Sequence, residues 1–258
     1  MNSNRVYFIG AGPGDPSLIT VKGLNILNRC GAVFTVPPYE VTFSVYLEGK
    51  DLFIPFAYDF DSLVEKVRTL LTKTEVAFLI PGDLAFFSPF EALIDTLSSQ
   101  AEVIPGVGIL NAASARLKKS LNHADNCTRT LVVSPKMLRD YPEGPSLRQL
   151  ASPGVTLVIY MNDLPAGKLS EQLREGYKTN VPVAVFHRLG LPGEVVLTGA
   201  LDDLACAKGA WSFLENDPKN DPTSLTLIVT GDSLGAVPNG HWWDKKREQS
   251  WRAKYPDC

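Results

Sequence analysis

The spacing of apolar and polar residues predicts that strands and helices alternate along the first half of the chain. Short apolar runs of β-favouring residues predict strands at residues 5–9, 32–36, 76–80 and 103–104. Apolar positions three and four residues apart predict helices at residues 17–29, 59–73, 90–98 and 111–117. Strands that alternate with helices in this way indicate parallel βαβ units.

The pattern starts again after residues 141–154, a segment rich in Pro, Gly and Ser that is the best candidate for a linker. Beyond it the same reasoning predicts strands at residues 155–161, 181–186, 194–199 and 225–230, and a helix at residues 169–176. We therefore predict two α/β domains, residues 1–137 and residues 150–258. The spacing assigns no element to the tail, residues 241–258.

Composition and charge narrow the class of protein. The chain has 258 residues, of which 45% are hydrophobic, so it can bury a sizeable core. Its formal net charge of -3 argues against a broad surface for nucleic acid or for an anionic membrane. No apolar run approaches the roughly 20 residues of a membrane-spanning helix. The first ten residues also lack the apolar core of a signal peptide.

The cysteines and histidines indicate neither a disulfide framework nor a metal site. The four cysteines form no C-x-x-C pair, and they stand at Cys30, Cys127, Cys206 and Cys258. In a chain of this length that pattern favours a reducing compartment, so we expect a cytoplasmic protein. The three histidines show no metal-ligand spacing, and no metal is expected.

The loop Gly10-Ala-Gly-Pro-Gly-Asp15 joins the first predicted strand to the first helix. Glycine has no Cβ, so a ligand can approach such a backbone closely. The dinucleotide fingerprint G-x-G-x-x-G would need a third glycine where Asp15 stands, and this carboxylate would meet the pyrophosphate. A nicotinamide-dependent oxidoreductase is therefore the weaker hypothesis. A tight structural turn explains the same residues equally well.

A second candidate for ligand binding follows the strand at residues 76–80. Asp83 could accept hydrogen bonds from a ribose or amino group, and Phe86 or Phe87 could cover an adenine or lie near a sulfonium. A turn aspartate and two core aromatics are the alternative.

Residues 7–23, Tyr-Phe-Ile-Gly-Ala-Gly-Pro-Gly-Asp-Pro-Ser-Leu-Ile-Thr-Val-Lys-Gly, resemble the opening motif of the tetrapyrrole methylases. These are the S-adenosylmethionine-dependent enzymes of corrin and sirohaem synthesis. Further motifs follow in the order of the family, at residues 81–83, 105–107, 156–161, 182–188 and 194–204. The resemblance spans nearly the whole chain. It implies two α/β domains with a cofactor cleft between them, and a homodimer.

The resemblance also implies the ligands and their contacts. The methyl donor would be S-adenosylmethionine, with S-adenosylhomocysteine as product, and the acceptor a tetrapyrrole. By position, the cofactor-binding residues would be Pro13, Pro81, Gly82, Asp83, Phe86, Gly108, Ile109, Met161 and Leu189. A tetrapyrrole carries several carboxylates, so the cleft is expected to hold a cation, with Arg116, Arg129 and Arg188 as candidates.

The departures from the family concern the catalytic base and the substrate. Val36 stands about where uroporphyrinogen-type members carry a proposed catalytic Asp. No catalytic residue is assigned, and Tyr39, Glu40 and His187 remain candidates. Residues 242–252 are similar to the end of precorrin-4 C11 methylases, whereas residues 88–90 resemble precorrin-2 C20 methylases. The first hypothesis is therefore a precorrin C-methyltransferase of cobalamin biosynthesis, acting at C11 of precorrin-4. The alternative is an S-adenosylmethionine-binding protein of this fold with another acceptor or no methylase activity.

Overall fold

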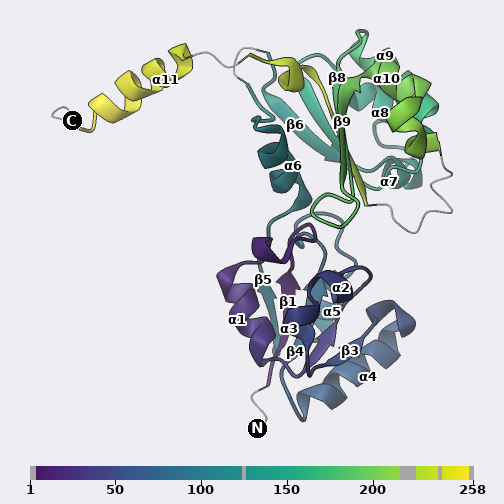
Figure 1. The fold of residues 1–258 in the computed structure, drawn as a ribbon, viewed down its shortest axis with the longest axis vertical. Helices are drawn as coiled ribbons and strands as arrows, with labels where there is room; N and C mark the ends of the chain where they lie inside the picture. Colours follow the sequence, from purple (N-terminus) through teal and green to yellow (C-terminus); the bar gives the residue numbers. More distant parts are fainter. Residues whose placement is uncertain (1–3, 124–125, 216–224, 238–239, 256–258) are drawn as a thin grey trace.

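The structure, a computed structural model, describes residues 4–123, 126–215, 225–237 and 240–255 (Figure 1). It contains two five-stranded sheets, each covered by helices and stacked along the long axis of the molecule (Figure 1). The predicted fold class, two α/β domains, is confirmed. Cys258 lies outside the described residues.

The first sheet is parallel throughout and has the strand order β3-β2-β4-β1-β5. Its strands are β1 (Val6–Gly10), β2 (Ala32–Phe34), β3 (Asp51–Phe53), β4 (Val76–Ile80) and β5 (Ala101–Ile104). Its helices are α1 (Val21–Arg29), α2 (Tyr39–Thr42), α3 (Ser44–Leu47), α4 (Phe60–Leu71) and α5 (Glu91–Thr96), with a 3-10 turn η2 (Pro55–Ala57). The predicted parallel βαβ pattern therefore holds in this domain.

Both faces of the first sheet are buried, because successive side chains of a strand point to opposite faces. Val6 and Phe8 of β1 pack with α4 and α5, whereas Tyr7 and Ile9 pack with α1 and α3. The five residues of β1 are accordingly all buried.

The start of α1 differs from the prediction at Ser17. Asp15 instead accepts a hydrogen bond from the Ser17 backbone N–H and caps a short 3-10 turn, η1 (Pro16–Leu18). Thr20 then caps α1, with its Oγ1 accepting from the Gly23 N–H at 3.1 Å. Two caps in succession satisfy the free N–H groups of both turns.

The second sheet has the order β6-β7-β10-β8-β9 and is mostly antiparallel, with β6 and β7 as its parallel pair. Its strands are β6 (Arg129–Val133), β7 (Val155–Ile159), β8 (Pro182–His187), β9 (Val195–Ala200) and β10 (Thr226–Thr230). Its helical segments are α6 (Ile109–Leu117), α7 (Pro135–Asp140), α8 (Leu147–Leu150), α9 (Ala166–Tyr177), α10 (Leu201–Cys206), η3 (Gly209–Glu215) and η4 (Asp232–Gly235). Two tight turns between β8 and β9, in which the Leu191 N–H donates to the Arg188 carbonyl and the Glu194 N–H to the Leu191 carbonyl, reverse the chain and produce the antiparallel β8–β9 pair.

The chain crosses from the first domain to the second before residues 141–154, the segment predicted to be the linker. β6 lies inside the range predicted for the first domain, yet it pairs with β7 of the second sheet. The helix α6 also packs on that sheet, through Ala113 against Val158 and Phe186. The crossing therefore falls between β5 and α6, because strand pairing rather than local composition decides where a strand belongs.

The tail, which the spacing left unassigned, forms α11 (His241–Lys246) and continues as a π-helical segment, η5 (Arg247–Arg252). It projects away from the second domain (Figure 1). Among the described residues, no helix is long and apolar enough to cross a membrane.

Candidate functional site

Three loops meet closely at the carboxyl ends of β1, β4 and β5. A Cβ placed on Gly106 would lie 2.5 Å from the carbonyl oxygens of both Gly10 and Gly82. A Cβ on Gly10 would lie 2.6 Å from the Gly106 nitrogen. Real Cβ atoms do not approach so closely, so this junction requires glycine. The carboxyl end of a parallel sheet is also where α/β proteins bind their ligands.

Backbone hydrogen bonds hold two of these loops together. The Gly12 N–H donates to the Gly82 carbonyl at 3.0 Å, and the Gly82 N–H donates back to the Gly12 carbonyl at 2.7 Å. The buried Tyr39 hydroxyl also donates to the Gly12 carbonyl, at 2.9 Å. Burial raises the pKa of Tyr39, which keeps this hydroxyl protonated and able to donate. Tyr39 is consequently a structural donor here and a poor general base.

A hollow between the two domains lies beside these loops, and we call it the interdomain hollow. Five of the nine residues predicted to bind the cofactor line it: Pro13, Pro81, Gly82, Ile109 and Leu189. Tyr39, Arg188 and Leu191 complete much of its wall. The hollow thus joins the first loop, the loop after β4, the start of α6 and the loop after β8.

The β8–β9 connection lies between the two domains (Figure 1), and its residues Arg188, Leu189 and Leu191 line this hollow. A Cβ on Gly14 would collide with the Leu191 side chain, and Gly190 lies against Pro13 and the Asp15 nitrogen. Glu194 holds the connection in shape by accepting from the Gly190 N–H at 2.9 Å. That hydrogen bond, and then the charge of Arg116 at 3.0 Å, lower the pKa of Glu194.

A second hollow, the aromatic hollow, lies on the other side of the loop after β4. Pro81, Asp83 and Phe86 of the predicted cofactor set line it, together with Val36 and Phe56. Its remaining wall is mostly apolar and includes Phe34, Phe78, Phe87, Pro89 and Phe90. Phe86 belongs to its exposed rim.

Asp83 is positioned from two sides. Its Oδ1 accepts from the Ala85 N–H at 2.9 Å. A Cβ on Gly108 would collide with its carboxylate, so the glycine leaves room for the charge. Burial, and then the negative charge of Asp83, raise the pKa of Tyr160 to about 12. The Tyr160 ring lies 6.0 Å from that of Phe86, which links the two domains across the site.

Two of the nine predicted residues line neither hollow. Gly108 contacts Asp83 instead. Met161 follows Tyr160 at the end of β7 with a φ of 47°, a left-handed conformation that is uncommon outside glycine. No motif marked Leu191 or Phe56 as part of the site. Folding alone places Leu191 in the interdomain hollow and Phe56 in the aromatic hollow.

The three candidate cations separate in the structure. Arg188 lines the interdomain hollow, and its Nε donates to the Pro192 carbonyl at 2.9 Å. Arg116 is paired with Glu194, and Arg129 donates to the Pro153 carbonyl at 3.3 Å. Arg188 is therefore the candidate that lines a hollow.

The remaining candidates for a base are not placed in either hollow. His187 Nδ1 lies 3.0 Å from the Thr226 hydroxyl. One carboxylate oxygen of Glu40 is buried and finds no hydrogen-bond partner among the described residues. Among the residues that the structure describes, no three His, Cys, Asp or Glu side chains lie close enough together to hold a metal ion.

These features define a two-domain α/β protein with a ligand site at the carboxyl ends of a parallel sheet, closed by a loop of the second domain. Residues 5–205 match the tetrapyrrole (corrin/porphyrin) methylases, and the chain belongs to this family. The resemblance found in the motifs is thereby confirmed, and the chain is a methyltransferase.

Known relatives agree with this assignment. A precorrin-4 C(11)-methyltransferase of Pseudomonas aeruginosa is 30% identical, over 90% of this chain and 91% of its own. The structure of a cobalt precorrin-4 methyltransferase of cobalamin biosynthesis shares the fold, with a TM-score of 0.76 at 23% identity over 91% of this chain and 96% of its own. A uroporphyrin-III C-methyltransferase from Thermus thermophilus, solved with S-adenosylhomocysteine, has a TM-score of 0.66 at 25% identity, covering 90% and 93%.

Proposed function

We propose that the chain transfers a methyl group from S-adenosylmethionine to a precorrin of cobalamin biosynthesis, and that the acceptor is C11 of precorrin-4. The observation that carries this proposal is the interdomain hollow, where five family-derived positions from four separate loops meet. The names of the Pseudomonas relative and of the cobalt precorrin-4 methyltransferase support this acceptor.

The residues of the interdomain hollow fit a folded nucleoside with a thioether chain. Ile109, Leu189 and Leu191 provide apolar walls. Gly82 has a φ of 69°, and the nearest atom to a Cβ placed on it would be the Ile109 nitrogen at 3.9 Å, so the space beside it is open to a ligand. We propose that all nine residues contact the cofactor, Met161 and Gly108 from its edges. When bound, S-adenosylmethionine supplies a methyl group on a cationic sulfur.

The aromatic hollow fits the acceptor. Its phenylalanine side chains offer flat apolar surface to a macrocycle, and Arg188 offers a guanidinium to a carboxylate at the junction of the two domains. The chain then has to hold the two reactants in line and exclude water. A pyrrole-type carbon is itself an electron-rich nucleophile, so the attack needs no strong base at Val36.

The second candidate function is binding of S-adenosylmethionine without methylation of a precorrin. It is favoured by Val36, an apolar residue in the wall of the aromatic hollow, which stands about where uroporphyrinogen-type members carry a proposed catalytic Asp. We also propose, from the family resemblance and the absence of a disulfide pattern in the sequence, that the protein is a cytoplasmic homodimer.

Calorimetric titration with S-adenosylhomocysteine tests the cofactor site. Micromolar binding is expected for the wild-type chain, with at least a tenfold loss for Leu189→Glu, which places a charge in the apolar wall. Asp83→Ala and Met161→Ala test the other predicted contacts. Tyr141→Ser, an exposed residue outside both hollows, is the matched control. Absence of binding to the wild type would overturn the proposal.

Incubation with S-adenosylmethionine and precorrin-4 separates the two candidate functions. A methyltransferase converts the precorrin to a product heavier by one methyl group in mass spectrometry. Binding of S-adenosylhomocysteine without any mass gain, on this and other precorrins, would favour the second candidate.

A further inference from the structure

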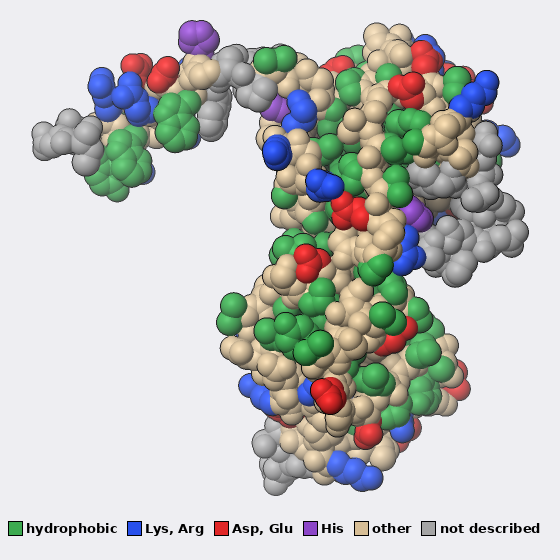
Figure 2. Space-filling model, viewed as in Figure 1, with side chains coloured by type: hydrophobic (Ala, Val, Ile, Leu, Met, Phe, Trp, Pro, Cys, Tyr) green, Lys and Arg blue, Asp and Glu red, His purple; other side chains and the backbone are tan. Residues whose placement is uncertain are grey.

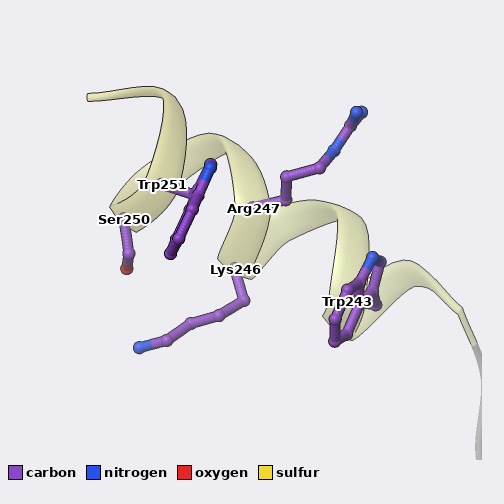
Figure 3. Close-up of a pocket in the computed structure, with 5 residues that line it drawn as sticks. All are labelled: Trp243, Lys246, Arg247, Ser250 and Trp251. Atoms are coloured by element: carbon purple, nitrogen blue, oxygen red, sulfur yellow. The ribbon is translucent and has the colours of Figure 1, made fainter. Parts of the chain in front are cut away.

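The tail carries large aromatic side chains that the rest of the chain leaves exposed. We call residues 241–255 the C-terminal arm. Its Trp243 is 69% exposed, Trp251 is 55% exposed, and Tyr255 lies 4.7 Å from the Trp251 ring. Trp243 and Trp251 line one apolar hollow with Lys246 and Arg247 (Figure 3). Exposed aromatic surface of this kind marks a site of interaction.

The charge of the arm is opposite to that of the whole chain. The arm has five Lys and Arg residues against two acidic ones, a formal net charge of +3, whereas the chain has -3. Aromatic residues and arginine are enriched at the centres of protein interfaces, where a few of them dominate the binding energy. The arm therefore fits an acidic protein surface that also offers apolar side chains.

The first domain carries a surface of that description, residues 51–61, which we call the acidic strip. It begins with the edge strand β3 and ends at the start of α4. Four large apolar side chains on it are exposed: Leu52, Ile54, Phe56 and Phe60. Three aspartates accompany them, all exposed and with no Lys or Arg in the strip: Asp51, Asp59 and Asp61. Figure 2 shows green and red side chains side by side at this edge of the lower domain.

The acidic strip already binds one cation of its own chain. Lys66 places its ammonium 4.4 Å from the centre of the Phe53 ring. An aromatic ring flanked by carboxylates attracts further cations in the same way. Edge strands are ordinarily protected by charge or by a covering element. β3 exposes Leu52, and Ile54 directly after it is also exposed, so this edge is suited to a covering element.

We propose that the C-terminal arm of one copy of the chain docks on the acidic strip of a second copy. The two surfaces carry formal charges of +3 and -3, and each presents aromatic residues that its own copy does not cover. Within one copy the arm projects sideways from the second domain and lies apart from the domain that carries β3 (Figure 1). A twofold axis gives two equivalent contacts of this kind. The inference rests on the proposed homodimer and not on the proposed reaction.

The contact reaches the active site of the second copy. Phe56 belongs both to the acidic strip and to the wall of the aromatic hollow. The arm of one copy therefore borders the acceptor site of the other. A polyanionic tetrapyrrole is a poor occupant of the strip itself, because three carboxylates would repel it.

Sedimentation equilibrium of the full chain tests the contact. The wild type is expected to dimerise, and Trp243→Ser with Trp251→Ser to weaken the dimer by about 30-fold or more, the effect of losing an interface hot spot. Tyr141→Ser, an exposed aromatic outside the arm and the strip, is the matched control and is expected to leave the dimer unchanged. Circular dichroism confirms that each variant is folded.

A charge exchange identifies the partner surface. Lys246→Glu with Arg247→Glu is expected to weaken the dimer, as is Asp51→Lys with Asp61→Lys. All four changes in one chain restore opposite charges across the contact, so dimerisation is expected to return. Failure of this restoration overturns the strip as the partner of the arm.

The outcomes separate the inference from the proposals before it. A wild-type chain that remains monomeric at about 100 μM, which is 100 times the protein concentration of the other measurements, overturns both the proposed homodimer and the proposed docking. A dimer whose dissociation constant is unchanged in every arm variant overturns the docking alone. If the chain is monomeric and sediments with phosphatidylserine vesicles, and the arm variants do not, the arm binds membranes instead of a second copy. Titration with S-adenosylhomocysteine on the same samples reports on the cofactor site independently.

Discussion

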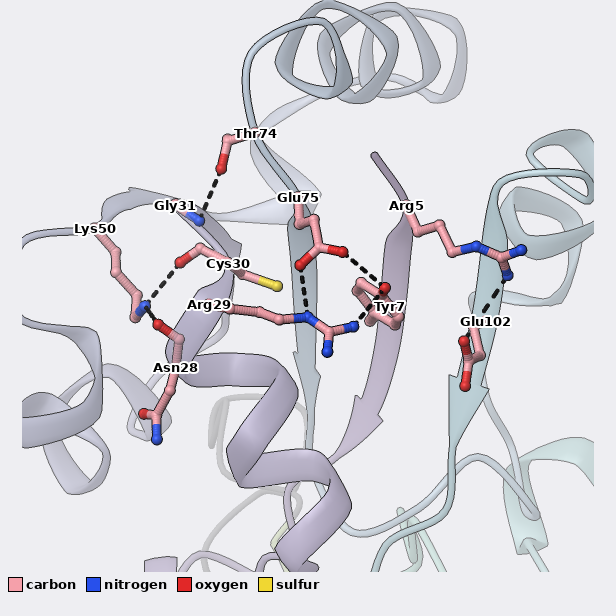
Figure 4. A network of polar contacts seen from close by, with 10 residues as sticks. All are labelled: Arg5, Tyr7, Asn28, Arg29, Cys30, Gly31, Lys50, Thr74, Glu75 and Glu102. Atoms are coloured by element: carbon pink, nitrogen blue, oxygen red, sulfur yellow. Dashed lines mark hydrogen bonds and ion pairs between the residues drawn. The ribbon is translucent and has the colours of Figure 1, made fainter. Parts of the chain in front are cut away.

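The two ends of the first sheet are built in different ways. At the amino ends of the strands, side chains are tied together: Arg29 Nε lies 2.6 Å from Glu75, and both bond to the Tyr7 hydroxyl (Figure 4). Nearby, the Lys50 ammonium donates to the Asn28 carbonyl at 3.1 Å and to the Cys30 carbonyl at 2.7 Å. At the carboxyl ends, glycine loops touch through their backbones and leave two hollows.

The difference separates stability from function. A network of partly exposed charges contributes little free energy per pair, but it fixes α1 to β4 without leaving room for a ligand. Backbone contacts between glycines bring loops close while keeping side chains out of the space that a ligand needs. Changes at the two ends are therefore expected to affect different properties.

The largest expected effect is at the glycine junction. Gly106→Ala places a methyl group 2.5 Å from two carbonyl oxygens, so the loops must separate. We expect a loss of about 2–3 kcal/mol in the free energy of unfolding, together with loss of S-adenosylhomocysteine binding. Urea denaturation and calorimetry measure both.

Gly167→Ala, in the helix α9, is the control for this change, because the nearest atom to its new methyl group outside that helix turn would be the Ala205 carbonyl oxygen of α10, at 4.0 Å. It is expected to be neutral or to stabilise by a few tenths of a kcal/mol. A Gly106→Ala variant that behaves like this control would contradict the close junction.

The next effect concerns the hydroxyl that supports the first loop. Tyr39→Phe removes the hydrogen bond to the Gly12 carbonyl, which the Gly82 N–H continues to satisfy. A cost of about 1 kcal/mol in unfolding free energy is expected, with weaker ligand binding, since Tyr39 lines the interdomain hollow. Unchanged affinity in calorimetry would remove Tyr39 from the site.

A pH dependence is expected from the opposite end of the sheet. Burial, and then the charge of Glu75, raise the pKa of Cys30 to about 12, from 9.0 in an unfolded chain. Between these values the unfolded state has lost the proton that the folded state keeps, so stability falls as the pH rises above about 9.

Urea unfolding at pH 8, 9 and 10 tests this dependence in the wild type and in Cys30→Ala. The variant loses packing at every pH, but its curve is expected to be flatter above pH 9, by at most about 1.4 kcal/mol per pH unit for one proton. Parallel curves would show that Cys30 does not titrate as described.

The smallest effect is expected within the amino-end network. Glu75→Gln removes the ion pair with Arg29, whose side chain is 53% exposed, and the cost is expected to stay below about 1 kcal/mol. Affinity for S-adenosylhomocysteine is expected to remain at the wild-type value. A tenfold change in affinity would mean that the two ends of the sheet are coupled.

The predictable part of the fold was its local periodicity. The helix predicted at residues 59–73 is α4, Phe60–Leu71, and the strand predicted at residues 76–80 is β4 with the same bounds. Long periodic segments are recognisable because the residues that define them are neighbours in sequence. The three-residue strand β3 was missed, since alternation over three positions carries almost no signal.

The site residues predicted from the motifs remain predictions. The proposed roles of Pro13, Gly82 and Leu189 came from the family resemblance, and folding then placed them in one hollow. Met161 stays a prediction, because it follows β7 in a left-handed conformation and lines neither hollow.

The sequence by itself determined the alternation of the longer strands and helices, the glycine loop and the family, because these follow from neighbouring residues and short motifs. Only the tertiary structure decided that β6 pairs in the second sheet, that this sheet is mostly antiparallel, and that Arg188 rather than Arg116 faces the hollow. Strand pairing and the partner of a charged side chain depend on residues far apart in the chain. Local spacing does not encode which of these distant segments will meet.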